Sequence, residues 1–167
     1  NTTGAFTFAV SGSSTVAGIF GPTGTTNIIS LQNVDLSGGQ LGNGVTGTIN
    51  IGGTLTMPTG NGILERSTIT VTGTTTVAAS RTLTLNNDNG VKTFIGTVDI
   101  DATGTWLSTS VSTAGNLVFR NGIINDGTSF SAAVATFTTT DNQTISGATA
   151  LSFSGVVTVT GGGITVV

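Results

Sequence analysis

Asp99 and Asp101 are the residues whose type and spacing most suggest chemistry. In an extended strand, residues two apart point to the same side, with their side chains about 6 to 7 Å apart. Two carboxylates at that separation could hold a calcium ion with the help of carbonyl oxygens, or could serve as the acid and base of a glycosidase. Both alternate with Val98 and Ile100, which favours a solvated strand face. Asp99 and Asp101 are therefore weak metal candidates, and we expect no catalytic residues.

The segment Asn86-Asn87-Asp88-Asn89-Gly90 is also rich in potential oxygen ligands. It lacks the closing Glu and the ligand spacing of an EF-hand loop, and the chain has no glycine-rich nonapeptide repeats of the calcium-binding β-roll type. The same residue types commonly form turns, because Asn and Asp side chains hydrogen-bond to nearby backbone and Gly adopts positive φ. A polar turn is the favoured interpretation, and we expect no cofactor.

The chain contains neither His nor Cys. Structural zinc sites of the usual type, thiol nucleophiles and catalytic triads with an imidazole base are therefore excluded. The chain also has one Trp, Trp106, and no Tyr, whereas sugar-binding sites usually present exposed aromatic platforms. We expect Trp106 in the core or at a cap, and we expect that the protein is not an enzyme.

Charge limits the choice of partners. Only Lys92, Arg66, Arg81 and Arg120 are basic, and the formal net charge is −3. Since no basic stripe is available to neutralise phosphates, we expect no nucleic-acid partner. No apolar run approaches the roughly 18 to 20 residues of a membrane helix, so we expect no membrane span. The abundance of Thr, Ser, Gly and Asn, with few charges, favours a secreted, extracellular or cell-surface location.

Short alternating runs of branched aliphatic residues and Thr predict an all-β fold. Each run places its apolar side chains on one face, and Gly, Asn and Asp between the runs mark changes of direction. The predicted interior consists of Leu55, Ile69, Val71, Leu83, Leu85, Val98, Ile100, Phe119 and Phe137.

The stretch FRNGIINDGTSF, residues 119–130, helps to choose the architecture. Its two turn signals lie only a few residues apart, yet Phe119, Phe130 and either Ile123 or Ile124 are expected to be buried. A β-helix-like solenoid explains both features, because each turn becomes a corner between two faces of one coil. An antiparallel β-sandwich or jelly roll is the alternative, since Asn-Gly also forms tight hairpins.

Four segments over about residues 94–160 share one rhythm, namely FIGTVDIDATGTW, NLVFRNGIINDGTSF, ATFTTTDNQTISG and LSFSGVVTVTG. Together they resemble the β-helical repeats of large secreted bacterial surface proteins, of the adhesin or autotransporter-passenger kind. The resemblance implies an adhesive or structural role, and it brings no catalytic residues with it.

We expect residues 1–167 to form a single β domain, with residues 1–10 as a possible exchanged N-terminal strand. The ends of a strand stack have unpaired backbone groups, and this chain has no charge after Asp141 to protect them. The predicted function is a structural subunit of an extracellular filament, stalk or adhesive layer, whose copies bind one another by strand addition. The predicted self-association residues are Phe6, Phe8, Val10, Ile164 and Val166.

Three alternatives stay open at this point. The chain could be a carbohydrate- or surface-binding module that recognises host or cell-surface glycans, or a β-helical enzyme that degrades polysaccharide. It could also be one part of a longer polypeptide whose neighbouring repeats cover both ends.

Overall fold

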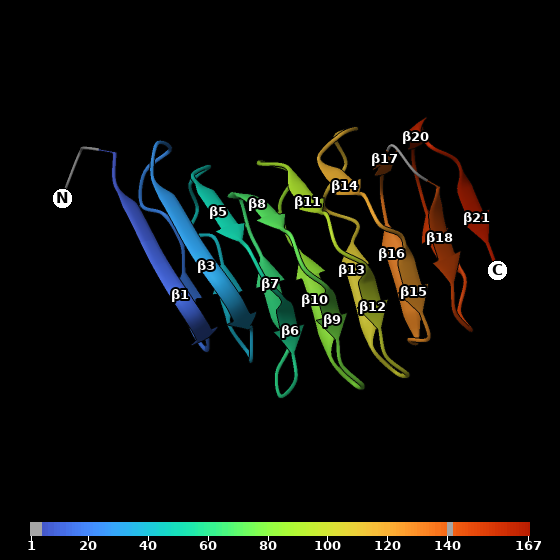
Figure 1. Cartoon of the computed structure of the whole chain (residues 1–167), viewed down its shortest axis with the longest axis horizontal. Coiled ribbons are helices and arrows are strands. Elements are labelled where there is room, and N and C mark those ends of the chain that lie inside the picture. Colours follow the sequence, from blue (N-terminus) through green and yellow to red (C-terminus); the bar gives the residue numbers. More distant parts are fainter. Residues whose placement is uncertain (1–4, 140–141) are drawn as a thin grey trace.

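Short strands wind into a three-sided parallel β-solenoid of about seven turns (Figure 1). This structure is a computed structural model, and it describes residues 5–139 and 142–167. Over those residues every strand pair is parallel, which confirms the predicted solenoid and excludes the antiparallel sandwich. The same residues include no helix that is long and apolar enough to cross a membrane.

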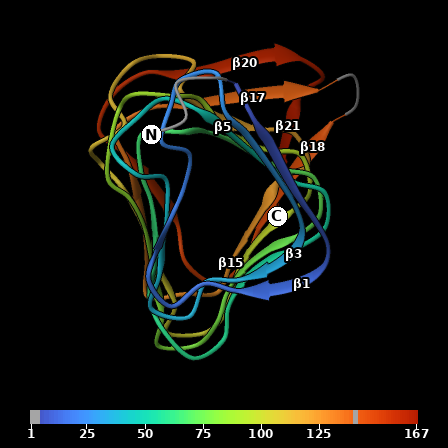
Figure 2. The same ribbon diagram turned by 90° about the vertical axis from the view of Figure 1, so that its left-hand side faces the viewer.

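Seen along its axis, the solenoid has a roughly triangular outline (Figure 2). Face 1 consists of β1 (Thr7–Thr15), β3 (Ile28–Asp35), β5 (Thr48–Ile51), β8 (Thr68–Val71), β11 (Lys92–Phe94), β14 (Leu117–Phe119), β17 (Ala135–Thr139) and β20 (Val157–Gly161). Face 2 consists of β6 (Leu55–Met57), β9 (Thr75–Val77), β12 (Val98–Ile100), β15 (Ile123–Asn125), β18 (Gln143–Ser146) and β21 (Ile164–Val166). Face 3 consists of β2 (Ile19–Phe20), β4 (Gln40–Leu41), β7 (Gly62–Leu64), β10 (Thr82–Leu85), β13 (Thr105–Ser108), β16 (Ser129–Ala132) and β19 (Leu151–Phe153).

The long strand β3 links faces 1 and 2. Its first half pairs with β5 and its second half with β6, so these two faces form one continuous sheet. β1 runs beside β3 along both halves, with a shift in register between Val10 and Ser13. The second half of β1 therefore extends face 2 as well.

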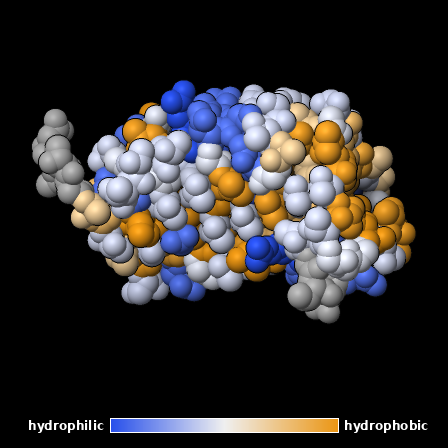
Figure 3. Space-filling view, turned by 90° about the horizontal axis from the view of Figure 1, so that it is seen from above, coloured by the Kyte–Doolittle hydropathy of each residue, from blue (hydrophilic) through white to orange (hydrophobic). Residues whose placement is uncertain are grey.

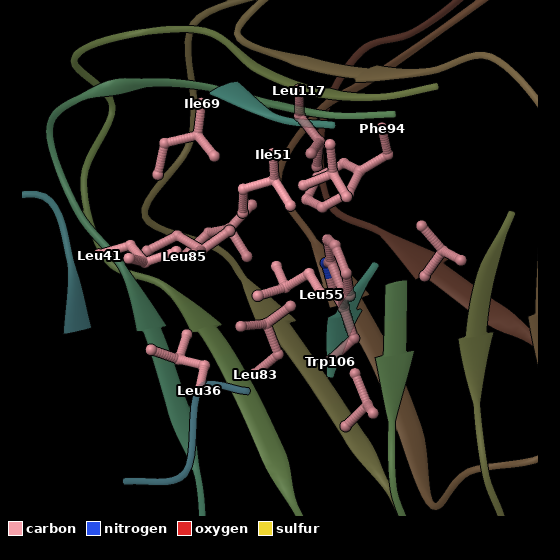
Figure 4. Packing of buried hydrophobic residues seen from close by; sticks show 14 of the residues in the cluster. Leu36, Leu41, Ile51, Leu55, Ile69, Leu83, Leu85, Phe94, Trp106 and Leu117 are labelled. Carbon is pink, nitrogen blue, oxygen red and sulfur yellow. The ribbon is translucent and has the colours of Figure 1, made fainter. Parts of the chain in front are cut away.

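Period-two alternation gives the solenoid a continuous apolar interior. Side chains from all three faces meet around the axis, as the close view in Figure 4 shows. Every residue of the predicted interior is buried, which confirms that prediction: Leu55, Ile69, Val71, Leu83, Leu85, Val98, Ile100, Phe119 and Phe137.

The stretch 119–130 forms two corners of one coil, as predicted. Phe119 ends β14, Ile123 begins β15 and Phe130 lies in β16, and all three are buried. Ile124 is the half-buried partner that faces outward. At the first corner Gly122 has φ +81°, and a Cβ there would lie 2.1 Å from the carbonyl oxygen of Thr144. Only glycine fits this corner, because the next coil passes so close.

Aromatic residues concentrate in the interior of the later coils. Phe94, Phe119 and Phe137 stack along face 1, with ring centroids 5.7 and 5.4 Å apart. Trp106 stacks on Phe130 across face 3 at 5.5 Å. The Trp106 indole N–H, buried with its ring, donates to Ser108 Oγ at 2.9 Å. Trp106 is thus a core residue, one of the two positions predicted for it.

Residues in register on successive strands form straight columns along the axis. One inward column runs through all eight strands of face 1, namely Val10, Leu31, Ile51, Val71, Phe94, Phe119, Phe137 and Val159. A second column on the same face contains Ile49, Ile69, Lys92 and Leu117, so a single lysine interrupts aliphatic neighbours.

Candidate functional site

The N-terminal end of the solenoid is open. Among the described residues β1 pairs only with β3, so its other edge has no strand partner. Phe8 is 44% exposed, and its ring meets that of Phe20 edge-on at 5.9 Å. A hollow of about 280 Å³ opens beside them and is lined mainly by apolar side chains, including Val10, Val16 and Leu31. This end presents a free strand edge around an apolar hollow.

The C-terminal end has the same character. The terminal strands β20, β21 and β19 each pair on one side only within the described residues. Val159 is 48% exposed and Val166 is 74% exposed, although both lie in columns that are buried elsewhere. A hollow of about 490 Å³ is lined by residues that include Leu151 and Phe153. Figure 3 shows hydrophobic surface gathered toward this end of the molecule.

The predicted self-association residues divide between these two ends. Phe6, Phe8 and Val10 lie at the N-terminal end, where Phe6 precedes β1 and its carbonyl accepts from the Ile28 amide. Ile164 and Val166 lie in β21 at the other end. The structure therefore brings together the members of each group, and it separates the two groups by the length of the solenoid (Figure 1).

Two aromatic residues belong to these ends and were missing from the sequence prediction. Phe20 lies in the two-residue strand β2, and Phe153 lies in β19. The two-residue β2 gives no local signal for Phe20, whereas Phe153 alternates with Ser152 and Ser154 but could not be assigned to an end from this pattern alone. Only the closing of the coil on face 3 places them beside the terminal strands.

Residues 1–10, predicted as an exchanged strand, are described from residue 5 onward, and residues 1–4 lie outside the described part. Thr7 to Val10 belong to β1 and pair with β3 of the same chain. Exchange of this strand between copies stays a prediction.

The Asp99 and Asp101 carboxylates lie near a third acid. Asp99 is a half-buried residue of β12, and Asp101 follows that strand. Because Ile100 is in register with Asn125, Asp101 lies beside Asp126 of the next coil. Burial and the like charges of Asp101 and Asp126 raise the pKa of Asp99. Among residues 5–139 and 142–167, no three acidic side chains converge as metal ligands would.

The loop 86–90 surrounds a cation that belongs to the chain itself. Lys92 points inward from β11 and its side chain is fully buried. Its ammonium donates to the carbonyl oxygens of Asn87, Asn89 and Gly90, with N–O distances of 3.1, 2.6 and 2.8 Å. Burial lowers the pKa of Lys92 to about 8, although Glu65 and Asp88 act in the opposite direction. The loop carbonyls that a calcium ion would require are thus engaged by an ammonium group.

Asp88 joins this loop to the loop 109–116 of the next coil. Its Oδ1 accepts from the amides of Ser112 and Thr113 at 2.9 and 2.8 Å, and its Oδ2 accepts from both hydroxyls. Burial alone would raise the pKa of Asp88, but hydrogen bonds from Thr113, Ser112 and Asn116 outweigh it and lower the pKa to about 2. Lys92 and Asp88 therefore stabilise two successive corners between faces 3 and 1, residues 86–91 and 109–116.

Comparison with known proteins found no matching family model, no matching curated protein and no matching solved structure. The functional argument therefore depends on the geometry of this chain.

Proposed function

We propose that the chain is a structural module of an extracellular filament, stalk or adhesive layer, in which copies bind end to end by strand addition. The observation that supports the proposal is the open structure of the two ends of the solenoid. Each end combines free edges of parallel strands with an apolar hollow. Burying exposed apolar surface and pairing free backbone groups both favour association.

A second copy is the occupant that fits both ends. All strands run parallel, so the edge at one end has the direction that the edge at the other end requires. Contact between two different ends is heterologous, and it propagates as a filament unless its rotation closes a ring. The cell-surface location rests on composition, since low charge and abundant Thr and Gly suit a secreted repeat.

The test uses two neighbouring residues of β21 that face opposite ways. Val166 belongs to an inward column, whereas Thr165 is exposed on the outer side. We expect Val166→Lys to prevent assembly, because stacking would bury its ammonium without a partner. Thr165→Lys carries the same charge on the same strand and should assemble like the wild type.

Light scattering over a range of protein concentrations gives the mass of each variant, and circular dichroism checks that each is folded. Wild-type protein should grow with concentration and show filaments or rings by negative-stain microscopy. A wild-type protein that stays monomeric at every concentration would overturn the proposed function.

A further inference from the structure

The axial columns of the solenoid continue from the first coil to the last without a break. On face 1, the inward column begins at Val10 and ends at Val159. On face 2, a column begins at Ser14 and ends at Val166, passing through Val34, Leu55, Thr75, Val98, Ile123 and Ile145. Each column therefore ends in a residue without a neighbour on one side. Val10 and Ser14 are half-buried at the N-terminal end, and Val159 and Val166 are exposed at the C-terminal end.

Face 3 follows the same rule. Phe20 is in register with Leu41, and Leu41 with Leu64 and then Leu85. At the other end of this face, Ser108 is in register with Ala132, and Ala132 with Phe153. Thr84 is in register with Leu107. Leu85 and Ser108 are the next residues of the same two strands, so they belong to one column. This column thus begins with Phe20 and ends with Phe153.

We propose that copies of this chain stack in one defined register, in which β20 of one copy pairs in parallel with β1 of the next and places Val159 against Val10. This inference rests on the proposed self-association and specifies its geometry. The same placement sets Val166 against Ser14 and Phe153 against Phe20. β1 keeps its pairing with β3 and contributes only its free edge, so no strand leaves its own chain.

The register is determined by all three faces together. A shift of one residue would turn inward side chains outward, because side chains alternate along a strand. A shift of two residues would set Val10 against Gly161, which has no side chain to fill the hollow, or, in the other direction, against Val157. Either shift would also move the columns of faces 2 and 3 out of line. Only the proposed register continues the columns of all three faces at once. In that register the first coil of one copy stacks on the last coil of another as successive coils stack within one chain.

Outward-facing pairs on face 1 allow a direct test. Ala9 begins an outward row that passes through Ser30, Asn50, Thr70, Thr93, Val118 and Thr136 and ends at Thr158. In the proposed register Ala9 of one copy lies beside Thr158 of another. Neighbouring strands are about 4.8 Å apart, which suits a disulfide. The wild-type chain has no Cys, so engineered thiols have no competitors.

The experiment mixes two single-cysteine proteins under mild oxidation and follows the covalent dimer by non-reducing electrophoresis. We expect Ala9→Cys with Thr158→Cys to form the mixed dimer roughly tenfold faster than Ala9→Cys with Thr160→Cys, because the control pair would be about 8 Å apart. Thr158 and Thr160 both face outward on β20, so the control differs only in position along the strand.

Equal or reversed rates of mixed-dimer formation by the two pairs, or no mixed dimer at all, would overturn the proposed register. If light scattering still shows assembly, the proposed function stays intact. A mixture that neither cross-links nor assembles would overturn both.

Discussion

Lys92 is the residue at which this solenoid departs furthest from its own pattern. Its position in the column is aliphatic on either side, with Ile69 before it and Leu117 after it. A buried ammonium is costly unless its donors are satisfied. Here the side chain reaches from the interior to the corner, where three main-chain carbonyls accept from it. Lys92 thereby fixes a loop that has few apolar residues of its own.

Lys92 also makes the stability of the protein depend on alkaline pH. Its pKa is about 8 in the folded chain, below the ordinary value of 10.5. Between these values the unfolded chain binds more protons than the folded chain, so stability rises with pH and the gain is complete above about 10.5. We expect an increase on the order of 2 kcal/mol in the free energy of unfolding from pH 8 to 10.5, allowing for solvent screening near the corner.

The composition allows a change of stability between pH 8 and 10.5 to be assigned to Lys92. The chain has a single Lys and no Tyr, Cys or His, so no other side chain titrates in that range. Chemical denaturation at several pH values gives the stability, and Lys92→Met should show no such increase. Carbon NMR of the lysine Cε reports the pKa directly in the wild type. A midpoint near 10.5 would contradict the expected shift.

Two aspartates show how context decides the behaviour of one residue type. Hydrogen bonds to Asp88 favour its charged form and lower its pKa, whereas burial and two like charges raise the pKa of Asp99. Asp88 therefore contributes stability that is lost as pH falls from about 3.8 to about 2. The charge on Asp99 works against folding at neutral pH.

At the scale of the strand, the sequence predicted where apolar side chains point but not how polar ones are accommodated. Alternating runs such as Thr82 to Leu85 identified the interior correctly. Gln143 could not be anticipated, because its burial depends on bonds to Phe119 O and the Gly122 amide from the preceding coil. The same holds for Lys92, whose carbonyl partners are assembled only when the loop closes.

The candidate site was predictable to a similar extent. Phe8 and Val166 lie in strands that stand out near each end of the chain, so their place at the termini followed from the sequence. Phe20 lies in a strand too short to show a pattern, and Phe153 lies in a short alternating run; the proximity of both to the ends depends on coil closure. Lengths of individual coils vary with the corners, so register could not be read from a fixed period.

Strand β10 offers a test of the interior. Leu85 is buried and Thr84, its neighbour in the same strand, faces outward. We expect Leu85→Asp to lower the free energy of unfolding by on the order of 4 kcal/mol or more, since it buries an unpaired carboxylate and removes apolar packing. Thr84→Asp should change it by less than about 1 kcal/mol. Thermal unfolding followed by circular dichroism compares them, and equal melting temperatures would contradict the assigned faces.

At the scale of the whole molecule, each coil contacts mainly the coils before and after it. Stability in such a stack is close to a sum of coil and interface contributions, so terminal coils with one neighbour open more easily than central ones. We therefore expect amide hydrogen exchange to be slowest in β8 to β16 and fastest in β1, β2, β20 and β21. Mass spectrometry of peptides from dilute protein measures the exchange of each strand and should show this difference between central and terminal strands.

The same exchange measurement on assembled protein provides a control. At concentrations where copies stack, the terminal strands should gain protection while the central strands change little. Uniform exchange along the chain in dilute solution would contradict a stack with open ends.

The aromatic stack has a consequence for the order in which the chain acquires structure. Phe94, Trp106, Phe119, Phe130 and Phe137 all belong to the second half of the sequence, whereas the interior of the first half is mainly aliphatic. Close aromatic pairs add to the stabilisation from area burial alone. A chain that emerges from its N-terminus would therefore present its weaker coils first and gain its most stable template late. Structure would then spread backward, from later coils to earlier ones, against the direction of synthesis.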